Sequence, residues 1–262
     1  MRQYGLLGYP LSHSFSSGYF TEKFYSEGIF AVYENFPLPV IEQFPQLIKF
    51  KSQLVGLNVT IPYKQTIIPY LDELDPEAAE IGAVNVILIE RIKNKKPRLV
   101  GYNSDIIGFR ESIRPFVEAL RIPNKKTPSE NISNLPLKAL ILGTGGASKA
   151  INYGLNQLGV ETLFVSRNPT PGQVTYQDLD KKYYEDYRII VNTTPLGMYP
   201  QVETCPPIDY SALNSRHLLF DAVYNPEKTL FLKKGEERGA TIKNGLEMLH
   251  LQAEAAWKIW NP

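Results

Sequence analysis

Cysteine and histidine are scarce in this 262-residue chain, and long apolar runs are absent from it. With one cysteine, Cys205, the chain cannot form an internal disulfide framework, which fits a reducing compartment. Of the three histidines, His13 is interpreted as a loop residue that orders a turn, and His217 and His250 have no metal-ligand spacing with Cys205 or with each other, so we expect no metal. No apolar run approaches the roughly 18 residues of a membrane span, and the first residues lack the apolar stretch of a signal peptide. We therefore expect a soluble, cytoplasmic protein with no membrane partner.

The chain also lacks a charge excess of either sign. Its 28 Lys and Arg residues against 27 Asp and Glu give a net charge of +1. A nucleic-acid-binding protein usually carries a strong basic excess, so we expect no nucleic-acid partner. The hydrophobic content of 43% and the charged content of 21% are those of an ordinary globular protein with a sizeable core. The length allows one large domain or two small ones.

Short apolar β-rich runs alternate with helical patterns along the chain, which predicts an α/β fold with mostly parallel strands. The predicted strands are 3–7, 31–36, 54–59, 84–90, 98–101, 137–142, 162–165, 188–192 and 218–221. The predicted helices are 17–27, 40–49, 107–119, 148–158 and 246–260. Strands 84–90 and 98–101 are separated by "RIKNKKP", which we interpret as a solvated hairpin turn rather than a phosphate site.

A Pro-, Asn-, Ser- and Lys-rich stretch at 122–136 has no periodicity and is predicted to be a loop before a second sheet. The sequence "LKALILGTGGASKAINYGLNQLG" then predicts a buried strand, a glycine turn and an amphipathic helix. Gly143, Gly145 and Gly146 stand where a backbone turns tightly and approaches a pyrophosphate at a helix N-terminus. The third glycine of the G-x-G-x-x-G pattern is replaced by Ser148, so a plain strand-to-helix turn is the alternative.

The end of the next strand indicates which dinucleotide would bind. A NAD site usually has an acidic residue there for the ribose 2′-hydroxyl, whereas this chain has Ser166 and Arg167. A guanidinium suits a 2′-phosphate, which a carboxylate would repel. NADP is therefore the predicted cofactor, and an ordinary surface arginine is the alternative.

Eight motifs follow one another along nearly the whole chain: GYPLSHSFS (8–16), NVTIPYK (58–64), GAVN (82–85), GYNSDIIG (101–108), GTGGASKA (143–150), NTTPLGM (192–198), DAVYNPEKTLFL (221–232) and NGLEMLHLQAEAAWKIW (244–260). In this order they resemble the shikimate/quinate dehydrogenase family. The resemblance implies the reversible, NADPH-dependent reduction of 3-dehydroshikimate to shikimate. It also implies an α/β substrate domain of residues 1–106 completed by 240–262, a Rossmann-like NADP domain of residues 107–239, and an active-site cleft between the two.

By the resemblance, Lys64 is the catalytic lysine and Asp105 its carboxylate partner. The chemistry is suitable, because a lysine ammonium can deliver a proton to the ketone oxygen as hydride reaches the carbon. An aspartate nearby would orient the lysine and accept a hydrogen bond from a substrate hydroxyl. A structural Lys–Asp ion pair is the alternative.

The remaining site residues are also carried over motif by motif. The residues matched to substrate binding are Ser14 and Ser16 for the carboxylate, Thr60 and Asn85 for ring hydroxyls, and Tyr224 and Gln252. The residues matched to cofactor binding are Gly143, Thr144, Gly145, Gly146, Ala147, Ser166, Arg167, Asn168, Ala222 and Gly245. Met198 is expected near the nicotinamide ring or else in the core. Structural alternatives are a turn or helix cap for the serines, core packing for Tyr224 and an exposed helix face for Gln252.

The chain departs from the usual family pattern at several positions. Ser17 replaces a proline, and Phe20–Thr21 replaces the pair His–Asn, which changes how the first helix begins and packs. Val86 replaces a threonine and loses a hydroxyl, whereas Ser104 replaces a threonine and keeps one. No second basic residue follows Arg167 closely, so NADP preference depends on Arg167 with Ser166 and Asn168.

Three rival functions stay open on the sequence: a quinate or aminoshikimate dehydrogenase, a non-catalytic shikimate-binding sensor, and a folate-type dehydrogenase. Retention of Lys64 and Asp105 favours an enzyme over a sensor. The Ser14–Ser16 pair and the sequence "NSD" favour shikimate as the substrate. We expect a small-molecule enzyme that is a monomer or a homodimer.

Overall fold

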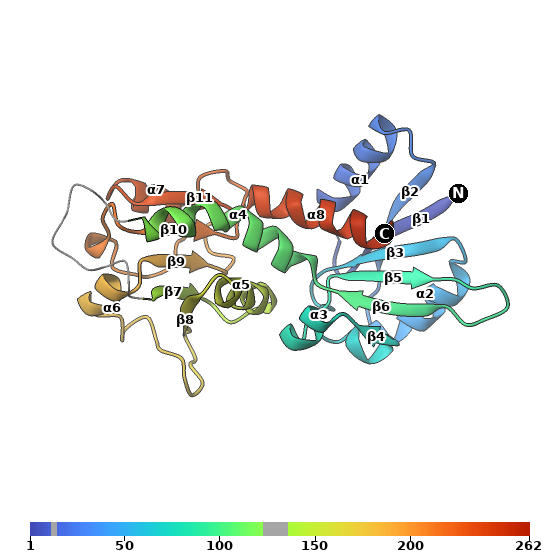
Figure 1. The fold of residues 1–262 in the computed structure, drawn as a ribbon, viewed down its shortest axis with the longest axis horizontal. Coiled ribbons are helices and arrows are strands. Elements are labelled where there is room, and N and C mark those ends of the chain that lie inside the picture. Colours follow the sequence, from blue (N-terminus) through green and yellow to red (C-terminus); the bar gives the residue numbers. More distant parts are fainter. Residues whose placement is uncertain (12–14, 123–135) are drawn as a thin grey trace. The chain divides into compact units, whose positions relative to one another are not determined.

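The computed structural model describes residues 1–11, 15–122 and 136–262, which form two compact units (Figure 1). The first unit consists of Met1–Ser104 with Ala253–Pro262, and the second of Asp105–Gln252. One boundary therefore lies at the start of helix α4 (Ser104–Arg121) and the other within helix α8 (Leu246–Trp260). Within the described ranges, no helix is long and apolar enough to cross a membrane.

The first unit is built on a six-stranded mixed sheet with the order β2-β1-β3-β5-β6-β4. Strand β1 pairs in parallel with both β2 and β3, whereas β5 runs antiparallel to β3 and to β6. The β5–β6 pairing confirms the predicted hairpin around "RIKNKKP". The strands are β1 (Arg2–Gly8), β2 (Ala31–Pro37), β3 (Leu54–Val59), β4 (Glu73–Leu74), β5 (Val86–Glu90) and β6 (Arg98–Tyr102).

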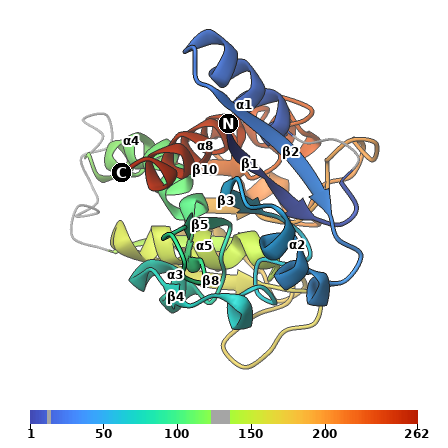
Figure 2. The same ribbon diagram turned by 90° about the vertical axis from the view of Figure 1, so that its right-hand side faces the viewer.

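Helices cover both faces of this sheet because side chains alternate along each strand. Leu7 and Leu57 pack with helix α2 on one face, while Tyr4 packs with α1 and α8 on the other. Figure 2 shows α1 and α8 together beside β1. The helices of this unit are α1 (Phe15–Ser26), η1 (Ile41–Gln43), α2 (Phe44–Phe50), η2 (Ile68–Tyr70), α3 (Pro76–Ile81) and the last part of α8.

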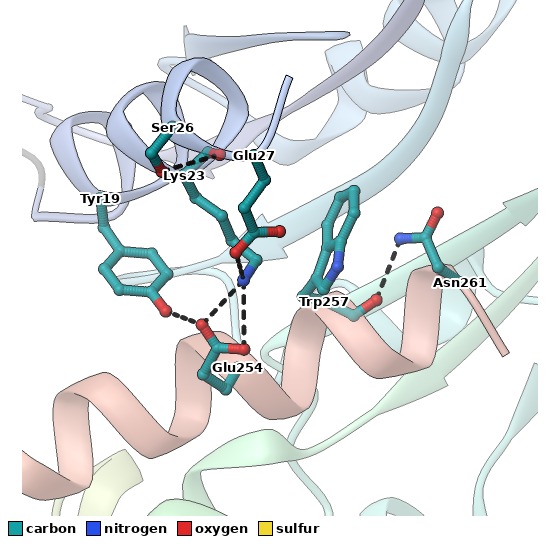
Figure 3. Close-up of polar contacts among 7 residues, drawn as sticks. All are labelled: Tyr19, Lys23, Ser26, Glu27, Glu254, Trp257 and Asn261. Atoms are coloured by element: carbon teal, nitrogen blue, oxygen red, sulfur yellow. Dashed lines mark hydrogen bonds and ion pairs between the residues drawn. The ribbon is translucent and has the colours of Figure 1, made fainter. Parts of the chain in front are cut away.

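Polar contacts fix the C-terminal part of α8 against α1 (Figure 3), and another fixes it against the sheet. Tyr19 donates a hydrogen bond to Glu254, and Lys23 Nζ lies 3.1 Å from Glu254 Oε1. The indole of Trp260 donates to the carbonyl of Ile87 at 3.1 Å. The last residues of the chain thus complete the core formed by the first residues.

The second unit has a fully parallel five-stranded sheet with the order β11-β10-β9-β7-β8. Read from β8, the strands follow the order 2-1-3-4-5, which is a doubly wound arrangement. The predicted Rossmann-like fold of this half is therefore confirmed. The strands are β7 (Leu137–Leu142), β8 (Val160–Val165), β9 (Ile189–Asn192), β10 (Leu218–Asp221) and β11 (Thr241–Asn244).

Each face of this second sheet is covered by its own apolar cluster. Helices α4 and α5 pack on one face, where the Cβ that an alanine would add at Gly154 would lie 2.9 Å from the ring of Phe109. Helices α6 and α7 pack on the other face. The helices of this unit are α4, α5 (Gly146–Gln157), α6 (Lys181–Asp186), η4 (Tyr210–Ala212), α7 (Leu230–Glu236) and the first part of α8.

A buried carboxylate joins the ends of β9 and β10. Asp221 is fully buried, and its Oδ1 accepts from Asn192 Nδ2 at 2.9 Å and from the N–H of Val223 at 3.0 Å. Its Oδ2 accepts from the hydroxyl of Thr229 at 2.5 Å. Burial raises the pKa of Asp221 to about 6, and these hydrogen bonds offset only part of that rise.

We predict that Gly56→Ala destabilises the first unit, since a Cβ there would lie 2.6 Å from the indole of Trp260. The free energy of unfolding should fall by roughly 1–3 kcal/mol, measured by urea denaturation. Gly18→Ala is the matched control, because nothing lies within 4 Å of a Cβ at this exposed position of α1. It should instead stabilise the protein by about 0.5–1 kcal/mol. Equal effects of the two substitutions would contradict this packing.

A second prediction concerns the pH dependence of stability. The pKa of Asp221 rises from 3.8 to about 6 on folding, so between these pH values the folded state holds more of its proton than the unfolded state. The free energy of unfolding should therefore fall as pH rises through this window, by about 3 kcal/mol from this group. Asp221→Asn removes that fall. In urea unfolding, the free energy of unfolding of the variant should therefore rise relative to that of the parent between pH 4 and pH 7.

Asp209→Asn is the control of opposite sign. Hydrogen bonds from the side chain and the N–H of Ser211 hold the pKa of Asp209 below its usual value. The free energy of unfolding of the parent should therefore rise relative to that of this variant as pH rises. A gap between the parent and Asp221→Asn that does not change with pH would contradict the assignment of a raised pKa to Asp221.

Candidate functional site

The second unit contains a pocket of about 460 Å³ at the carboxyl ends of β7, β8 and β9. The order of the sheet reverses between β7 and β9, and ligands of doubly wound folds bind at this switch point. The pocket is lined by Gly143, Thr144, Gly145, Val165, Ser166, Arg167, Asn168, Tyr176, Thr193, Thr194, Pro195, Leu196 and Pro207.

Glycine occurs in the predicted phosphate loop for two different structural reasons. Gly143 has a φ of +104°, and a Cβ there would lie 2.9 Å from the hydroxyl of Thr193, so glycine is required by the protein itself. Gly145 and Gly146 have nothing within 4 Å of an added Cβ, which leaves their backbone open to a ligand. Ser148, at the third glycine position, is buried, and its hydroxyl donates to the carbonyl of Gly145 at 2.6 Å.

These glycines lead into α5, whose N-terminal N–H groups are suited to an anion. Gly145 is the N-cap residue and supplies no side-chain cap. Thr144 lines the pocket, and Ala147 lies in the first turn of the helix. The residues present therefore fit the pyrophosphate of a dinucleotide.

The side chains expected to recognise a 2′-phosphate lie together beyond β8. Ser166, Arg167 and Asn168 all line the pocket, and the N–H of Asn168 donates to Ser166 Oγ at 3.2 Å. Arg167 is solvent-exposed. Its cation can therefore meet a ligand phosphate within the same pocket.

Sequence reasoning missed Tyr176, which faces the same pocket as Arg167. The loop after β8 returns to the sheet, because Val174 bonds to Phe164 and Ser166 through backbone hydrogen bonds. Burial raises the pKa of Tyr176, and the positive charge of Arg167 acts in the opposite direction. No motif identified this residue, because its place depends on how the loop folds back.

Two residues matched to the nicotinamide end of the cofactor lie side by side. A Cβ on Gly245 would lie only 2.4 Å from the carbonyl oxygen of Ala222, so glycine lets the two backbone segments touch. The N–H of Gly245 bonds to the carbonyl of Val223 at 3.3 Å. Met198 is 48% exposed, so it is no core residue.

In the first unit, the ends of β1 and β3 meet where the substrate motifs begin. A Cβ on Gly8 would lie 2.5 Å from the methyl group of Thr60, and the N–H of Thr60 bonds to the carbonyl of Leu7 at 2.9 Å. Lys64 follows one short turn later and is half-buried. Its carbonyl accepts a hydrogen bond from Val84 at 2.7 Å, which ties the lysine motif to the "GAVN" motif.

Asn85 is buried at the start of β5, beside the end of β3. Its carbonyl accepts from Val59 at 2.8 Å, and its Oδ1 accepts from the N–H of Ser104 at 2.7 Å. The hydroxyl of Ser104 accepts from Asn85 Nδ2 at 3.1 Å, so the hydroxyl retained at this position is used. Val86 points into the apolar core, where a threonine hydroxyl would be buried.

The serine motif lies partly outside the described residues. Ser14 and His13 are not among them, whereas Ser16 is in the first turn of α1 and half-buried. The side chain of Ser16 hydrogen-bonds the phenol of Tyr33. Of the four residues matched to substrate binding or catalysis in this unit that are described, all lie at the same end of the parallel strands β1 and β3: Ser16, Thr60, Lys64 and Asn85.

Helices α4 and α8 position two further predicted residues of the second unit, Asp105 and Gln252. A Cβ on Gly108 would lie 2.4 Å from the carbonyl of Met248 and 3.0 Å from Gln252 Cβ, so the two helices cross closely. Asp105 is buried three residues before Gly108, and residues three apart share one face of a helix. Gln252 is buried rather than exposed, and Tyr224 is 39% exposed rather than packed in the core.

The histidines have structural surroundings that differ. His217 is buried, and its two ring nitrogens contact the carbonyl of Tyr184 at 2.8 Å and the backbone N–H of Asn214 at 3.1 Å. Burial lowers the pKa of His217. His250 is exposed on α8. Within the part of the chain described, no three His, Cys, Asp or Glu residues converge on a common point that could hold a metal.

The two units thus present different chemistry. The second offers a glycine-edged, partly cationic pocket for a dinucleotide phosphate, and the first gathers hydroxyl, amide and ammonium groups suited to a polyhydroxylated substrate. Lys64 belongs to the first unit and Asp105 to the second, so their pairing stays a prediction.

Comparison with known proteins agrees with this geometry. A family model described as the shikimate dehydrogenase substrate binding domain matches residues 6–87. A shikimate dehydrogenase (NADP(+)) of Caldicellulosiruptor saccharolyticus is 34% identical over 276 residues, covering 99% of this chain and 92% of the relative.

Solved structures give the same result. Shikimate dehydrogenase from Aquifex aeolicus aligns with a TM-score of 0.81 and 30% identity, over 100% of this chain and 92% of that one. The enzyme from Thermus thermophilus, solved in complex with NADP(H) and shikimate, aligns with a TM-score of 0.79 and 28% identity, over 100% and 94% of the two chains. Full-length similarity at this level, joined to the motifs and the geometry above, shows that the chain belongs to the shikimate dehydrogenase family.

Proposed function

We propose that this chain catalyses the reversible, NADPH-dependent reduction of 3-dehydroshikimate to shikimate, a step of aromatic amino-acid biosynthesis. The observation that carries the proposal is the pocket of the second unit, in which Arg167 and the phosphate loop face one another. The substrate is a small molecule, and we place the enzyme in the cytoplasm as a monomer or a homodimer. Functionally, residues 1–106 with 240–262 would make most of the substrate contacts and residues 107–239 most of the cofactor contacts.

The cofactor would be held by three groups of residues in the second unit. Gly143, Thr144, Gly145, Gly146 and Ala147 suit the pyrophosphate. Ser166, Arg167 and Asn168 suit the 2′-phosphate, and the touching backbones of Ala222 and Gly245 suit the nicotinamide end. When bound, NADPH supplies the hydride that reaches the substrate carbonyl carbon.

Lys64 would supply the proton that the carbonyl oxygen needs as the hydride arrives. An ammonium is a donor only, so it stabilises developing negative charge on oxygen and then gives up its proton. In the reverse direction the neutral amine takes the proton back from the hydroxyl. Asp105, buried in the first turn of α4, would orient the lysine or accept from a substrate hydroxyl.

Substrate recognition would use neutral donors and acceptors. Ser14 and Ser16 would bind the carboxylate, while Thr60 and Asn85 would bind ring hydroxyls. Asn85 is well held for this task, because its amide is fixed by Ser104 on one side. Tyr224 and Gln252 would complete the contacts.

The experiment that tests the function follows NADPH absorbance with purified protein. Shikimate and quinate are each offered with NADP and with NAD. We expect NADPH formation with shikimate, and Lys64→Ala should lower kcat by roughly 10²–10⁴-fold while shikimate binding changes little.

Lys49→Ala is the matched control, since Lys49 is an exposed lysine of α2 in the same unit. It should keep the parental rate. If folded protein binds shikimate but reduces neither cofactor with either substrate, the result would favour a sensor over an enzyme. Near-parental turnover by Lys64→Ala would remove Lys64 from the mechanism.

Arg167 provides a separate test of the cofactor. Arg167→Ala should raise the Kd for NADP about tenfold or more, because a charge-assisted bond to the 2′-phosphate is lost. The Kd for NAD, which has no such phosphate, should hardly change. Lys182→Ala removes an exposed cation on helix α6 of the same unit and should affect neither constant. Equal losses for both cofactors would mean that Arg167 does not read the 2′-phosphate.

A further inference from the structure

A buried phenol lies behind the serine motif of the first unit. Tyr33 of β2 is 8% exposed, and its ring stacks on Phe20 of α1 with ring centroids 4.9 Å apart. Its Oη lies 2.7 Å from Oδ1 of Asn58 on β3, and it also bonds the side chain of Ser16. Tyr33 therefore connects α1, β2 and β3 at one point.

The directions of these hydrogen bonds follow from a count of protons. An amide oxygen only accepts, so the proton of Tyr33 points to Asn58 Oδ1. Ser16 must then donate its single proton to Tyr33 Oη. Burial raises the pKa of Tyr33 far above its usual value, so the phenol keeps its proton at any working pH. The resting network thus turns the proton of Ser16 inward.

A substrate carboxylate demands the opposite direction, because it is an acceptor only. Ser16 can donate outward, with its own Oγ still accepting a hydrogen bond, if Tyr33 turns its proton from Asn58 Oδ1 to Ser16 Oγ. This turn gives up the 2.7 Å bond to Asn58, and the stronger charge-assisted bond from Ser16 to the carboxylate offsets that loss. Hydrogen bonds in such a chain polarise one another, which would strengthen Ser16 as a donor.

We propose that Tyr33 is a positioning residue for carboxylate recognition, which holds Ser16 and turns its own proton from Asn58 to Ser16 when an anionic substrate binds. The proposal rests on the role of Ser16 in the proposed function. Tyr33 itself touches no substrate. Its phenol acts through Ser16, at the point where α1 meets the ends of β1 and β3.

The test compares Tyr33→Phe with the parent, using shikimate and its methyl ester. The variant keeps the ring that stacks on Phe20 and removes only the hydroxyl. We expect the KM and Kd for shikimate to rise about tenfold with kcat little changed, because the donor to a charged carboxylate is weakened. The methyl ester, which has no carboxylate charge, should be affected much less, so the preference for the acid over the ester falls.

Tyr4→Phe is the matched control. Tyr4 is a fully buried tyrosine of the neighbouring strand β1, whose hydroxyl bonds to Asn261 at 3.3 Å. Its removal should leave the acid-to-ester preference unchanged. The stoichiometry of NADP binding measures the fraction of each variant whose second unit is folded, because the cofactor pocket belongs to that unit. The retained kcat of Tyr33→Phe and Tyr4→Phe shows that their first unit is folded as well.

A double-mutant cycle with Ser16→Ala completes the experiment. If Tyr33 acts through Ser16, the double variant should lose no more preference for the acid than Ser16→Ala alone. Additive losses, or a Tyr33→Phe variant with parental KM for shikimate, would overturn the proposal. Absence of shikimate turnover in the parent would overturn the proposed function instead, so the two failures are distinguishable.

Discussion

Parallel pairing of β1 with β3 in the first unit, and of β7 with β9 in the second, is the constraint on which the candidate site residues of each unit depend. Parallel strands bring their carboxyl ends to one edge of a sheet, so loops that are far apart in sequence emerge side by side. The close approach then requires glycine at particular points. Gly8 lies against Thr60 in the first unit, and Gly143 lies against Thr193 in the second. A side chain at either glycine would separate the loops that carry the site residues.

Polar groups buried behind each edge give the loops a fixed conformation. In the second unit, Asn192 and Asp221 tie the loop after β9 to the one after β10. In the first, Asn85 and Ser104 perform the same task beside the end of β3. Such networks cost free energy when one partner is missing, so they specify a single arrangement. The raised pKa of Asp221 is one consequence, because burial of its carboxylate is only partly compensated by hydrogen bonds.

The sequence allowed much of this to be predicted where the pattern is local. Strands Leu54–Val59, Leu137–Leu142 and Leu218–Asp221 have the predicted bounds, because each is an apolar run with clear ends. Strand β11 was missed because Thr241–Asn244 is short and polar, and the predicted helix 40–49 is in fact a 3₁₀ turn followed by α2, with Pro45 at its start. Arg167 was identified by its spacing from the glycine loop. Tyr176 and Tyr33 could not be, because a folded-back loop and the register across three strands decide what they face.

The proposed role of Tyr33 also accounts for the absence of an arginine from the substrate motifs of the first unit, where a carboxylate would bind. A lysine ammonium placed beside the carboxylate acts as a point charge, so it would bind strongly but would accept many geometries. Hydroxyl groups held from behind bind less strongly and are more selective, since their donors must point in one direction. Under our proposal the phenol of Tyr33, stacked on Phe20 and bonded to Asn58, supplies that support from inside the domain. Selectivity for the acid would then depend on a buried network that no substrate atom reaches, and a motif made only of contacting residues does not reveal such a network.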